Sequence, residues 1–340
     1  MTRLAIIGGG SWGTALAVVL APRFPEIRLW VFERDLAVRM SDTRENDVYL
    51  PGFRIPANVR VTTEFAEALE GAGIVLGVTP SHVTRAIFER MLPYLDPSML
   101  FVSATKGLGP VAPADGSSQT LVRMSEVIRS VVATRFEPRI AVLSGPTFAR
   151  EVAAGEPAAV VISSTDPALN ELVQRAFSGP TFRLYTNTDP VGVEVGAALK
   201  NVIAIGAGVT SGLGLGNNTI AALVTRGLAE IARLAVAVGG DPRTLAGLAG
   251  LGDLVLTSTG ALSRNRQVGI ELGRGRRLEE IIGSMRMVAE GVQTTYAAVE
   301  LARGCAIEMP ITGQVDAILR GRRSPREAIR ELMERSLKGE

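Results

Sequence analysis

Two residue types that build many enzyme sites are almost missing from this chain. Its 340 residues include a single cysteine, Cys305, and a single histidine, His82. An intrachain disulfide is therefore impossible, which makes a reducing compartment the simplest expectation, and a zinc site of the usual ligand types is excluded. His82 stands in no motif, and we interpret it as a structural residue in the first turn of a helix.

An excess of charge of one sign is missing as well. The formal net charge is +2, with acidic and basic residues mixed throughout, whereas nucleic-acid binders usually carry a basic stripe. The longest apolar runs contain Lys200 or many glycines and look too short to span a bilayer, and the N-terminus lacks the features of a signal peptide. We expect a soluble, cytoplasmic protein with no nucleic-acid partner and no membrane span.

What the chain does have is enough apolar sequence for a large core, at 46% of its residues. Up to residue 187, apolar runs typical of strands alternate with segments of helical pattern. This alternation predicts a parallel sheet with helices on both faces. The expected strands are a run that starts at residue 4 and breaks into glycines, then 26–32, 73–79, 99–105, 139–145, 158–164 and 181–187. The expected helices are the segment after the glycines, 64–70, 81–92, 118–133 and 167–178.

After Asp189 no further strands are expected. We therefore predict a Rossmann-like, doubly wound α/β domain over residues 1–188 and an all-helical substrate and catalytic domain over residues 189–340. A homodimer through the helical domain is a reasonable expectation, because two-fold dimers are the commonest oligomers. The expected helices are 190–208, 219–239, 264–273, 278–283, 293–303, 311–319 and 325–337.

The sequence GGGSWG follows the first strand and opens a helix. Gly8, Gly10 and Gly13 fit the dinucleotide-binding pattern G-x-G-x-x-G in the context that its mechanism requires. Gly8 permits the tight turn, Gly10 lets the backbone approach a pyrophosphate, and Gly13 lets the helix pack closely on the strand. The alternative is a glycine turn without a ligand.

The second strand ends at Phe32, Glu33 and Arg34, where such folds contact the adenosine ribose. A carboxylate there accepts the ribose 2′-hydroxyl and repels a 2′-phosphate, so Glu33 favours NAD. Arg34 offers the opposite choice, because it can pair with the 2′-phosphate of NADP. Glu33 as a solvated loop charge is the remaining alternative. The cofactor is therefore NAD or NADP, with NAD slightly favoured.

Two lysines are candidates for proton transfer. Lys106 follows a strand of the predicted parallel sheet, at the edge where ligands of such sheets bind, or else is a solvated loop residue. Lys200 lies in GAALKNVIAIGAG, where a buried lysine needs a partner or exchanges its proton near neutral pH. A lysine that reaches water from a helix end is the alternative. The residues expected on the same helix face are Gly196, Ala197, Ile203, Ala204 and Ala207.

Two more segments carry polar groups among small and apolar residues. Asp253, in AGLGDLVLT, requires a partner if it is buried, and Lys200 is a natural one. Ser263 can cap a helix whose first turn contains Arg264 and Asn265, which makes a good phosphate site. The alternative for this second segment is an exposed basic turn. Together these residues indicate a nicotinamide-dependent enzyme with a lysine acid/base and a small anionic substrate.

Several long motifs resemble those of the NAD(P)-dependent glycerol-3-phosphate dehydrogenase family over nearly the whole chain. They are GGGSWGTALA, YLPG, ATKGL, SGPTFAREVAAG, LKNVIAIGAG, AGLGDLVLT, SRNRQVG, AEG and EMPIT. The resemblance implies reversible reduction of dihydroxyacetone phosphate to sn-glycerol 3-phosphate, which supplies glycerophospholipid synthesis. It also implies that Lys200 is the proton donor and acceptor and that Asp253 hydrogen-bonds the lysine or the substrate.

The same resemblance implies further contacts at the matching positions. The expected substrate contacts are Lys106, Gly145, Thr147, Asn201, Asp253, Thr257, Ser263, Arg264 and Asn265. The expected cofactor contacts, besides the three glycines and Glu33 or Arg34, are Ser11, Trp12, Phe32, Lys106, Ala149, Arg264, Val288 and Glu290. Lys106 is expected to take part in catalysis as well. Residues 111–117 look longer than in many relatives and are expected to form a surface loop.

Two other interpretations stay open at this point. One is a related two-domain dehydrogenase of the 6-phosphogluconate or 3-hydroxyisobutyrate kind, which also uses a lysine on a helix. The other is a regulator that binds NAD without catalysis, which would not need to keep Lys106, Lys200 and Asp253.

Overall fold

The structure is a computed structural model that describes residues 3–111, 120–285, 289–337 and 339. The chain forms two compact units, Met1–Val193 and Glu194–Glu340, called here the N-terminal and the C-terminal unit. Each unit has its own hydrophobic core.

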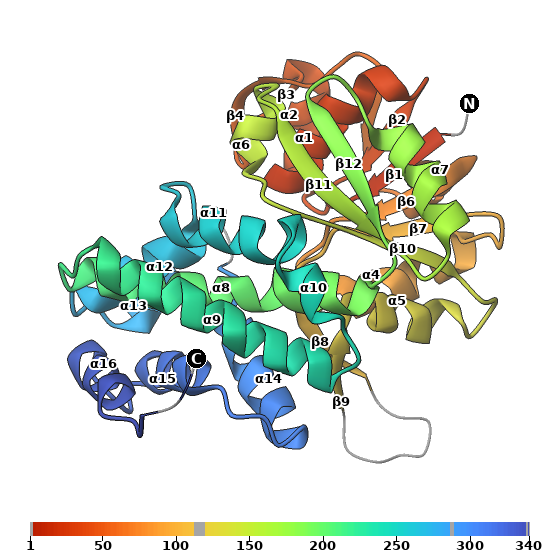
Figure 1. Ribbon diagram of the computed structural model, residues 1–340. Helices are drawn as coiled ribbons and strands as arrows, with labels where there is room; N and C mark the ends of the chain where they lie inside the picture. The colour runs from red at the N-terminus through yellow and green to blue at the C-terminus, as the bar shows by residue number, and fades with distance from the viewer. Residues whose placement is uncertain (1–2, 112–119, 286–288, 338, 340) are drawn as a thin grey trace. The chain divides into compact units, whose positions relative to one another are not determined.

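The N-terminal unit contains an eight-stranded sheet in the order β12-β11-β10-β7-β6-β1-β2-β5 (Figure 1). Because β1 lies between β2 and β6, the order in which strands are added to the sheet reverses at β1. Ligands of such sheets bind beside this switch point. The predicted strands are all present, and β5 is an additional strand that the pattern does not predict. The bounds are β1 Arg3–Ile7, β2 Ile27–Trp30, β5 Val59–Thr62, β6 Ala72–Gly77, β7 Leu100–Ser103, β10 Arg139–Ser144, β11 Ala158–Ser163 and β12 Phe182–Asn187.

One strand pairing departs from the predicted parallel sheet. β10 and β11 pair antiparallel, while the other neighbours in the sheet pair parallel. A parallel pair needs a crossover that returns the chain across the sheet. The segment between β10 and β11 instead contains the short helix α6 (Ala149–Ala153), which packs against α1 (Ser11–Leu20).

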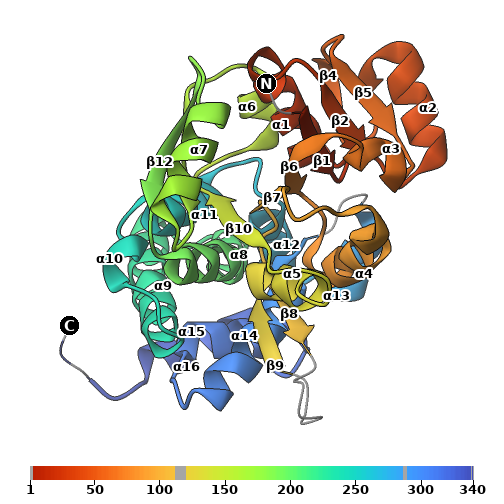
Figure 2. The same cartoon turned by 90° about the vertical axis from the view of Figure 1, so that its right-hand side faces the viewer.

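Helices cover both faces of this sheet, as expected. Leu4 and Ile6 of β1 point into one core, which also contains residues of α1, of α2 (Arg34–Thr43) and of α7 (Pro167–Phe177). The alternate residues Ala5 and Ile7 point into a second core, because successive strand residues face opposite sides. The second core is closed by α3 (Phe65–Leu69), α4 (Ser81–Met91) and α5 (Met124–Val132), of which α4 and α5 lie side by side in Figure 2.

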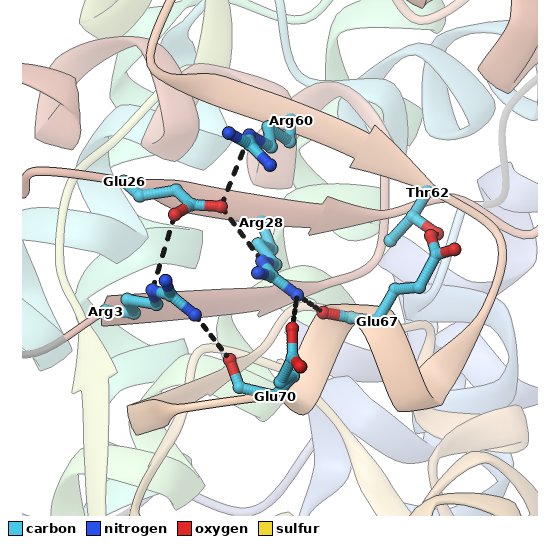
Figure 3. A network of polar contacts seen from close by, with 7 residues as sticks. All are labelled: Arg3, Glu26, Arg28, Arg60, Thr62, Glu67 and Glu70. Carbon is cyan, nitrogen blue, oxygen red and sulfur yellow. Dashed lines mark hydrogen bonds and ion pairs between the residues drawn. The ribbon is translucent and has the colours of Figure 1, made fainter.

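The β1, β2 and β5 strands are joined near their starts by a network of ion pairs (Figure 3). Arg28, whose side chain is 11% exposed, binds Glu26 at 3.0 Å and Glu70 at 3.1 Å. Arg3 and Arg60 also contact Glu26, at 3.3 and 3.4 Å. The hydrogen bond from Arg28 holds the pKa of Glu26 below its ordinary value. This end of the sheet is therefore structural, whereas the carboxyl ends of β1 and β6 remain for a ligand.

Two hairpins in this unit are absent from the sequence prediction. β3 (Glu45–Asn46) pairs with β4 (Leu50–Arg54), and β8 (Leu108–Val111) pairs with β9 (Thr120–Arg123). The expected helix over 118–133 is therefore wrong in its first part, since α5 starts at Met124. Val111 ends β8, and the rest of the surface loop expected over 111–117 lies outside the described residues.

Helices alone make up the described part of the C-terminal unit, as predicted, with a π-helical turn at Leu248–Gly252. Their bounds are α8 Pro190–Gly212, α9 Asn217–Ala237, α10 Pro242–Leu245, α11 Asp253–Thr259, α12 Arg264–Gly273, α13 Leu278–Ser284, α14 Gly291–Gly304, α15 Pro310–Leu319 and α16 Pro325–Met333. The short helices α10 and α11 are not among the expected ones, because their segments are too short for a helical period to show.

The α8 helix is the core of this unit, and Val193 to Thr210 are all buried. With 23 residues it is long and apolar enough to cross a bilayer, so the expectation that no run reaches that length is wrong. Its apolar window is 94% buried inside the protein, however, and a central core helix meets the same criteria. The helix is mostly apolar because it is buried among other helices of the unit.

Four glycines let α8 and α12 approach closely. A Cβ atom on Gly208 would lie 2.0 Å from the carbonyl oxygen of Arg266, and one on Gly269 would lie 2.0 Å from that of Ile205. Gly212 and Gly273 form the same kind of contact one turn further on. Small residues four apart on each helix permit this backbone contact. The seam fixes the start of α12 beside the middle of α8.

Candidate active site

The glycine turn after β1 has the geometry that its sequence predicts. Gly8 has a φ of +125°, and a Cβ atom there would lie 2.6 Å from the carbonyl oxygen of Val78, just after β6. A Cβ atom on Gly13 would lie 1.8 Å from the carbonyl oxygen of Gly8. Space is open only at Gly10, where a Cβ atom would meet nothing within 4 Å. The turn is thus closed on the protein side and open at the glycine expected to meet the pyrophosphate.

The start of α1 offers amides to an anion. Gly10 is the N-cap of α1 and makes no side-chain capping hydrogen bond. The first amides of a helix have no partner within the helix, and the helix dipole adds positive potential there. Ser11 and Trp12 lie in this first turn and are half-buried. These residues fit the diphosphate of a dinucleotide.

Asn46 is a residue of this turn that the sequence does not reveal. Its side chain is fully buried and donates to the carbonyl oxygen of Gly9 at 2.8 Å and to Thr14 Oγ1 at 2.9 Å. Its Oδ1 accepts from the backbone N–H of Tyr49 at 2.9 Å. The β3–β4 hairpin is thereby attached to the glycine turn. An asparagine beside a polar loop carries no signal of such burial, so only the fold identifies it.

Phe32, Glu33 and Arg34 follow β2 and are all exposed, with 67% of Phe32 accessible. The phenol of Tyr49 donates to Glu33 Oε1 at 2.7 Å, and this hydrogen bond raises the pKa of Tyr49 to about 12. Arg34 lies 3.9 Å from Glu64, with both side chains largely exposed, so this pair contributes little. Glu33 is therefore held in place, whereas Arg34 is loosely tethered.

Lys106, Gly145 and Thr147 come together at the carboxyl ends of the neighbouring strands β7 and β10. The carbonyl oxygen of Gly145 accepts from Lys106 Nζ at 3.4 Å and from Thr147 Oγ1 at 3.2 Å. A Cβ atom on Gly145 would lie 2.8 Å from Val160 Cα, and its φ of +155° also favours glycine. Ala149 opens α6 two residues after Thr147. The lysine therefore lies at the ligand-binding edge of the sheet.

The C-terminal unit contains a buried ion pair between Lys200 and Asp253, 53 residues apart in sequence. Lys200 is 4% exposed and Asp253 is 0% exposed. Lys200 Nζ donates to Asp253 Oδ1 and, at 2.8 Å, to Thr257 Oγ1. Thr257 in turn donates to the backbone oxygen of Asp253 at 2.7 Å. The pairing expected for these residues is confirmed, and the lysine does not reach water from a helix end.

Two opposing effects act on the charge of Lys200. Burial among apolar residues of α8 opposes a charge on Lys200, while the carboxylate of Asp253 favours the ammonium form. Thr257 fixes the direction in which the Nζ atom points. A lysine that is buried, oriented and able to change protonation state can exchange a proton with a bound ligand.

A chain of hydrogen bonds connects α8, α12 and α14 beside this pair. Asn265 Nδ2 donates to Asn201 Oδ1 at 2.9 Å, and Asn265 Oδ1 accepts from the N–H of Gly291 at 2.9 Å. A Cβ atom on Gly291 would lie 2.6 Å from Asn265 Oδ1, so glycine is required there. Ser263 caps α12 as expected, accepting from the N–H of Arg266 at 3.2 Å.

Arg264 and Glu290 lie at the starts of α12 and α14. Desolvation lowers the pKa of Arg264 and the charge of Glu290 raises it, although the arginine keeps exposed surface. Desolvation has the larger effect, so the pKa of Arg264 lies below its ordinary value. Val288, an expected cofactor contact, lies outside the described residues. His82 is the second residue of α4 and is exposed.

A sheet with a glycine turn of dinucleotide-binding geometry at its switch point, joined in sequence to a helical unit with a buried lysine, is typical of a dinucleotide-dependent dehydrogenase. Comparison with known proteins narrows this class. Residues 3–170 match the family described as NAD-dependent glycerol-3-phosphate dehydrogenase N-terminus, and residues 189–330 match its C-terminus. The chain belongs to this family, and it is an oxidoreductase that uses NAD or NADP.

Individual relatives agree over the full length. The glycerol-3-phosphate dehydrogenase [NAD(P)+] of Koribacter versatilis is 57% identical over 337 residues, covering 98% of each chain. That of Citrifermentans bemidjiense is 49% identical over 338 residues, covering 99% of this chain and 98% of its own. The crystal structure of glycerol-3-phosphate dehydrogenase from Coxiella burnetii matches with a TM-score of 0.91 at 40% identity, covering 98% of this chain and 99% of that one. The two other interpretations of the sequence lose their support.

Proposed function

We propose that this enzyme reduces dihydroxyacetone phosphate reversibly to sn-glycerol 3-phosphate, with Lys200 as general acid and base and with NADH preferred over NADPH. The observation that carries the chemistry is the burial of Lys200 against Asp253 and Thr257 in a helix that is mostly apolar. The substrate is supported by the name of a relative whose match covers 98% of this chain, glycerol-3-phosphate dehydrogenase [NAD(P)+].

The N-terminal unit holds the cofactor in this proposal. The bound nicotinamide supplies a hydride to the central carbon of the ketone or removes it from the alcohol. Gly8, Gly10 and the first amides of α1 bind the diphosphate. Glu33 accepts the ribose hydroxyl and excludes a 2′-phosphate, and the exposed ring of Phe32 borders the adenosine.

Proton transfer is the task of the C-terminal unit. As the ketone carbon is reduced, the Lys200 ammonium donates a proton to the ketone oxygen, which becomes the hydroxyl of the product. In the reverse direction the neutral amine removes that proton. Asp253 stabilises the ammonium and Thr257 holds its direction, so both act on the lysine and Asp253 can also contact the substrate.

The remaining polar residues hold the substrate. Arg264, exposed at the start of α12, is the best placed to bind the phosphate, together with the helix N-terminus that Ser263 caps. Asn201 and Asn265 already bind each other, so we propose that they hold α8 and α12 in register beneath the ligand. Lys106 and Thr147, which both donate to the carbonyl oxygen of Gly145, are the proposed substrate contacts at the carboxyl ends of β7 and β10.

The first test follows oxidation of NADH, and separately of NADPH, with dihydroxyacetone phosphate as acceptor. We expect rapid turnover with NADH and slower turnover with NADPH. If folded protein binds NADH but oxidises neither cofactor, the substrate assignment is wrong. A faster rate with NADPH would instead reject the role given to Glu33.

The role of Lys200 needs a second test. Lys200→Met removes the proton but leaves a buried carboxylate, so it is compared with Lys200→Met/Asp253→Leu, which replaces both charges by apolar groups. We expect both variants to lose about 10²- to 10⁴-fold or more in kcat while binding NADH normally. Thr257→Val keeps the ion pair and should lose less. Turnover that survives in a folded Lys200→Met variant would exclude the lysine as acid and base.

We further propose that the enzyme is a cytoplasmic homodimer whose product supplies glycerophospholipid synthesis. Support for this supply comes from the family to which the chain belongs. Disruption of the gene should then make growth depend on added glycerol phosphate, and light scattering should give twice the mass of the chain. Growth without that supplement, or the mass of a single chain, would reject the corresponding part.

A further inference from the structure

We infer that Tyr49 is a positioning residue for the cofactor: it holds the Glu33 carboxylate at the end of β2 and so sets the preference for NAD over NADP. The inference rests on the proposed function in one respect, the role of Glu33 at the adenosine ribose. It adds a residue from a hairpin whose position in the site only the fold reveals.

Tyr49 itself is held firmly. Its backbone N–H donates to Asn46 Oδ1 at 2.9 Å, and the buried Asn46 side chain donates to the carbonyl oxygen of Gly9 and to Thr14. The β3–β4 hairpin is therefore fixed to the same glycine turn that binds the diphosphate. From this anchored backbone the Tyr49 phenol reaches Glu33 Oε1 at 2.7 Å.

Among the described residues, the Glu33 carboxylate has a hydrogen bond from Tyr49 and from no other side chain. It is exposed, and as the N-cap of α2 it makes no side-chain capping hydrogen bond. A glutamate without contacts loses rotamer freedom when it binds a ligand, and that loss weakens binding. Among the described residues, Tyr49 contacts only the Oε1 oxygen, so Oε2 can accept the ribose 2′-hydroxyl. The phenol thus preorganises the carboxylate for NAD.

The competing cofactor is affected as well. A carboxylate that is fixed in place repels the 2′-phosphate of NADP, whereas a mobile one can turn away. Arg34, next in sequence, is exposed and only loosely paired with Glu64, so it can then pair with that phosphate. Release of Glu33 should weaken NADH binding and strengthen NADPH binding together.

The test uses Tyr49→Phe in the full chain and measures binding as well as turnover. Fluorescence titrations give Kd for NADH and NADPH, and calorimetry gives it for ADP-ribose and 2′-phospho-ADP-ribose. We expect the ratio of Kd for NADPH to Kd for NADH to fall by about tenfold, which corresponds to the loss of one hydrogen bond to a charged group. Because Tyr49 acts on cofactor binding in this inference, we expect KM for NADH to change more than kcat. Tyr94→Phe, at an exposed tyrosine of the same unit, is the matched control.

Glu33→Gln and the double variant separate the proposals. If Tyr49 acts through Glu33, Tyr49→Phe adds no further shift in the Glu33→Gln background. Glu33→Gln should also let the Tyr49 phenol ionise at lower pH, since the hydrogen bond to the carboxylate raises its pKa to about 12. Tyrosinate absorbance reports this change without any cofactor.

Three results would overturn the inference, and they differ from one another. A shift with Glu33→Gln but none with Tyr49→Phe leaves Glu33 in its role and removes Tyr49. Equal weakening of NADH and NADPH by Tyr49→Phe makes the tyrosine a support of the hairpin only. If neither variant shifts the ratio, the proposed role of Glu33 fails first and Tyr49 fails with it.

Discussion

Replacement of Gly269 by alanine tests whether the glycine seam between α8 and α12 sets the geometry of the proposed phosphate site. The new Cβ atom would lie 2.0 Å from the carbonyl oxygen of Ile205 and 2.8 Å from Gly208 Cα, whereas such atoms are essentially never closer than 3.0 Å. The obstacle is backbone on a buried helix, so the two helices must separate by about 1 Å, the difference between 3.0 and 2.0 Å. A cost of about 1–3 kcal/mol in unfolding free energy follows from overpacking of this kind.

The separation also has a functional consequence. α12 carries Asn265 and Arg264, and the 2.9 Å hydrogen bond from Asn265 to Asn201 would lengthen toward 4 Å and break. We expect KM for dihydroxyacetone phosphate to rise by about tenfold or more, because a misplacement of this size is felt in positioning. The Kd for NADH, which depends on the N-terminal unit in our proposal, should change little.

The assay compares urea unfolding and steady-state kinetics of Gly269→Ala with those of Gly313→Ala. Gly313 lies inside α15, is exposed and has nothing within 4 Å of its Cβ position. Alanine there should stabilise the protein by about 0.5–1 kcal/mol through helix propensity alone. If Gly269→Ala behaves like Gly313→Ala in both measurements, the close contact between the helices is wrong.

Two further predictions concern stability and pH. The hydrogen bond from Arg28 lowers the pKa of Glu26, so Glu26 stabilises the fold above the ordinary value of 4.5 and loses this effect as pH falls through the lowered pKa. In urea unfolding, wild type should be more stable than Glu26→Gln by about 1 kcal/mol at neutral pH, and the difference should vanish in acid. A difference that stays constant with pH would contradict the network. Glu230 is 2% exposed, accepts from the N–H groups of Ile311 at 2.6 Å and Thr312 at 3.1 Å, and has its pKa raised by desolvation. Glu230→Ala should lower the free energy of unfolding by at least about 2 kcal/mol, because it leaves two buried amides unpaired. The stability of wild type relative to Glu230→Gln should fall as pH rises from 4.5 toward the raised pKa. Thermal unfolding across pH measures both effects, and an opposite slope would show that Glu230 is not desolvated.

The order of elements and much of the chemistry can be predicted from the amino-acid sequence. Strands, the glycine turn and the long helices depend on residues within a few positions of one another, so period and turn chemistry reveal them. Lys200 is recognisable for a related reason, since it is the one charged residue in the apolar run GAALKNVIAIGAG. It is also one of only three lysines in the chain, with Lys106 and Lys338.

Other parts of the site depend on contacts between distant segments. Asn46 reaches Gly9 across 37 positions, Tyr49 reaches Glu33 across 16, and Asn265 reaches Asn201 across 64. No local pattern marks these residues, because an asparagine or tyrosine in a polar loop looks the same whether it is buried or solvated. The antiparallel β10–β11 pair belongs to the same class, since strand direction depends on where the connecting segment packs.

The kind of fold, the place of the dinucleotide turn and the candidate lysine for proton transfer can all be predicted from the amino-acid sequence, because each follows from short-range steric and burial rules. The groups that surround them become known only from the packing of the folded chain. The buried Lys200–Asp253 pair, the glycine seam between α8 and α12 and the hydrogen bond from Tyr49 to Glu33 arise when packed helices and a hairpin bring distant segments into contact. Such proximity is a property of the packed core as a whole.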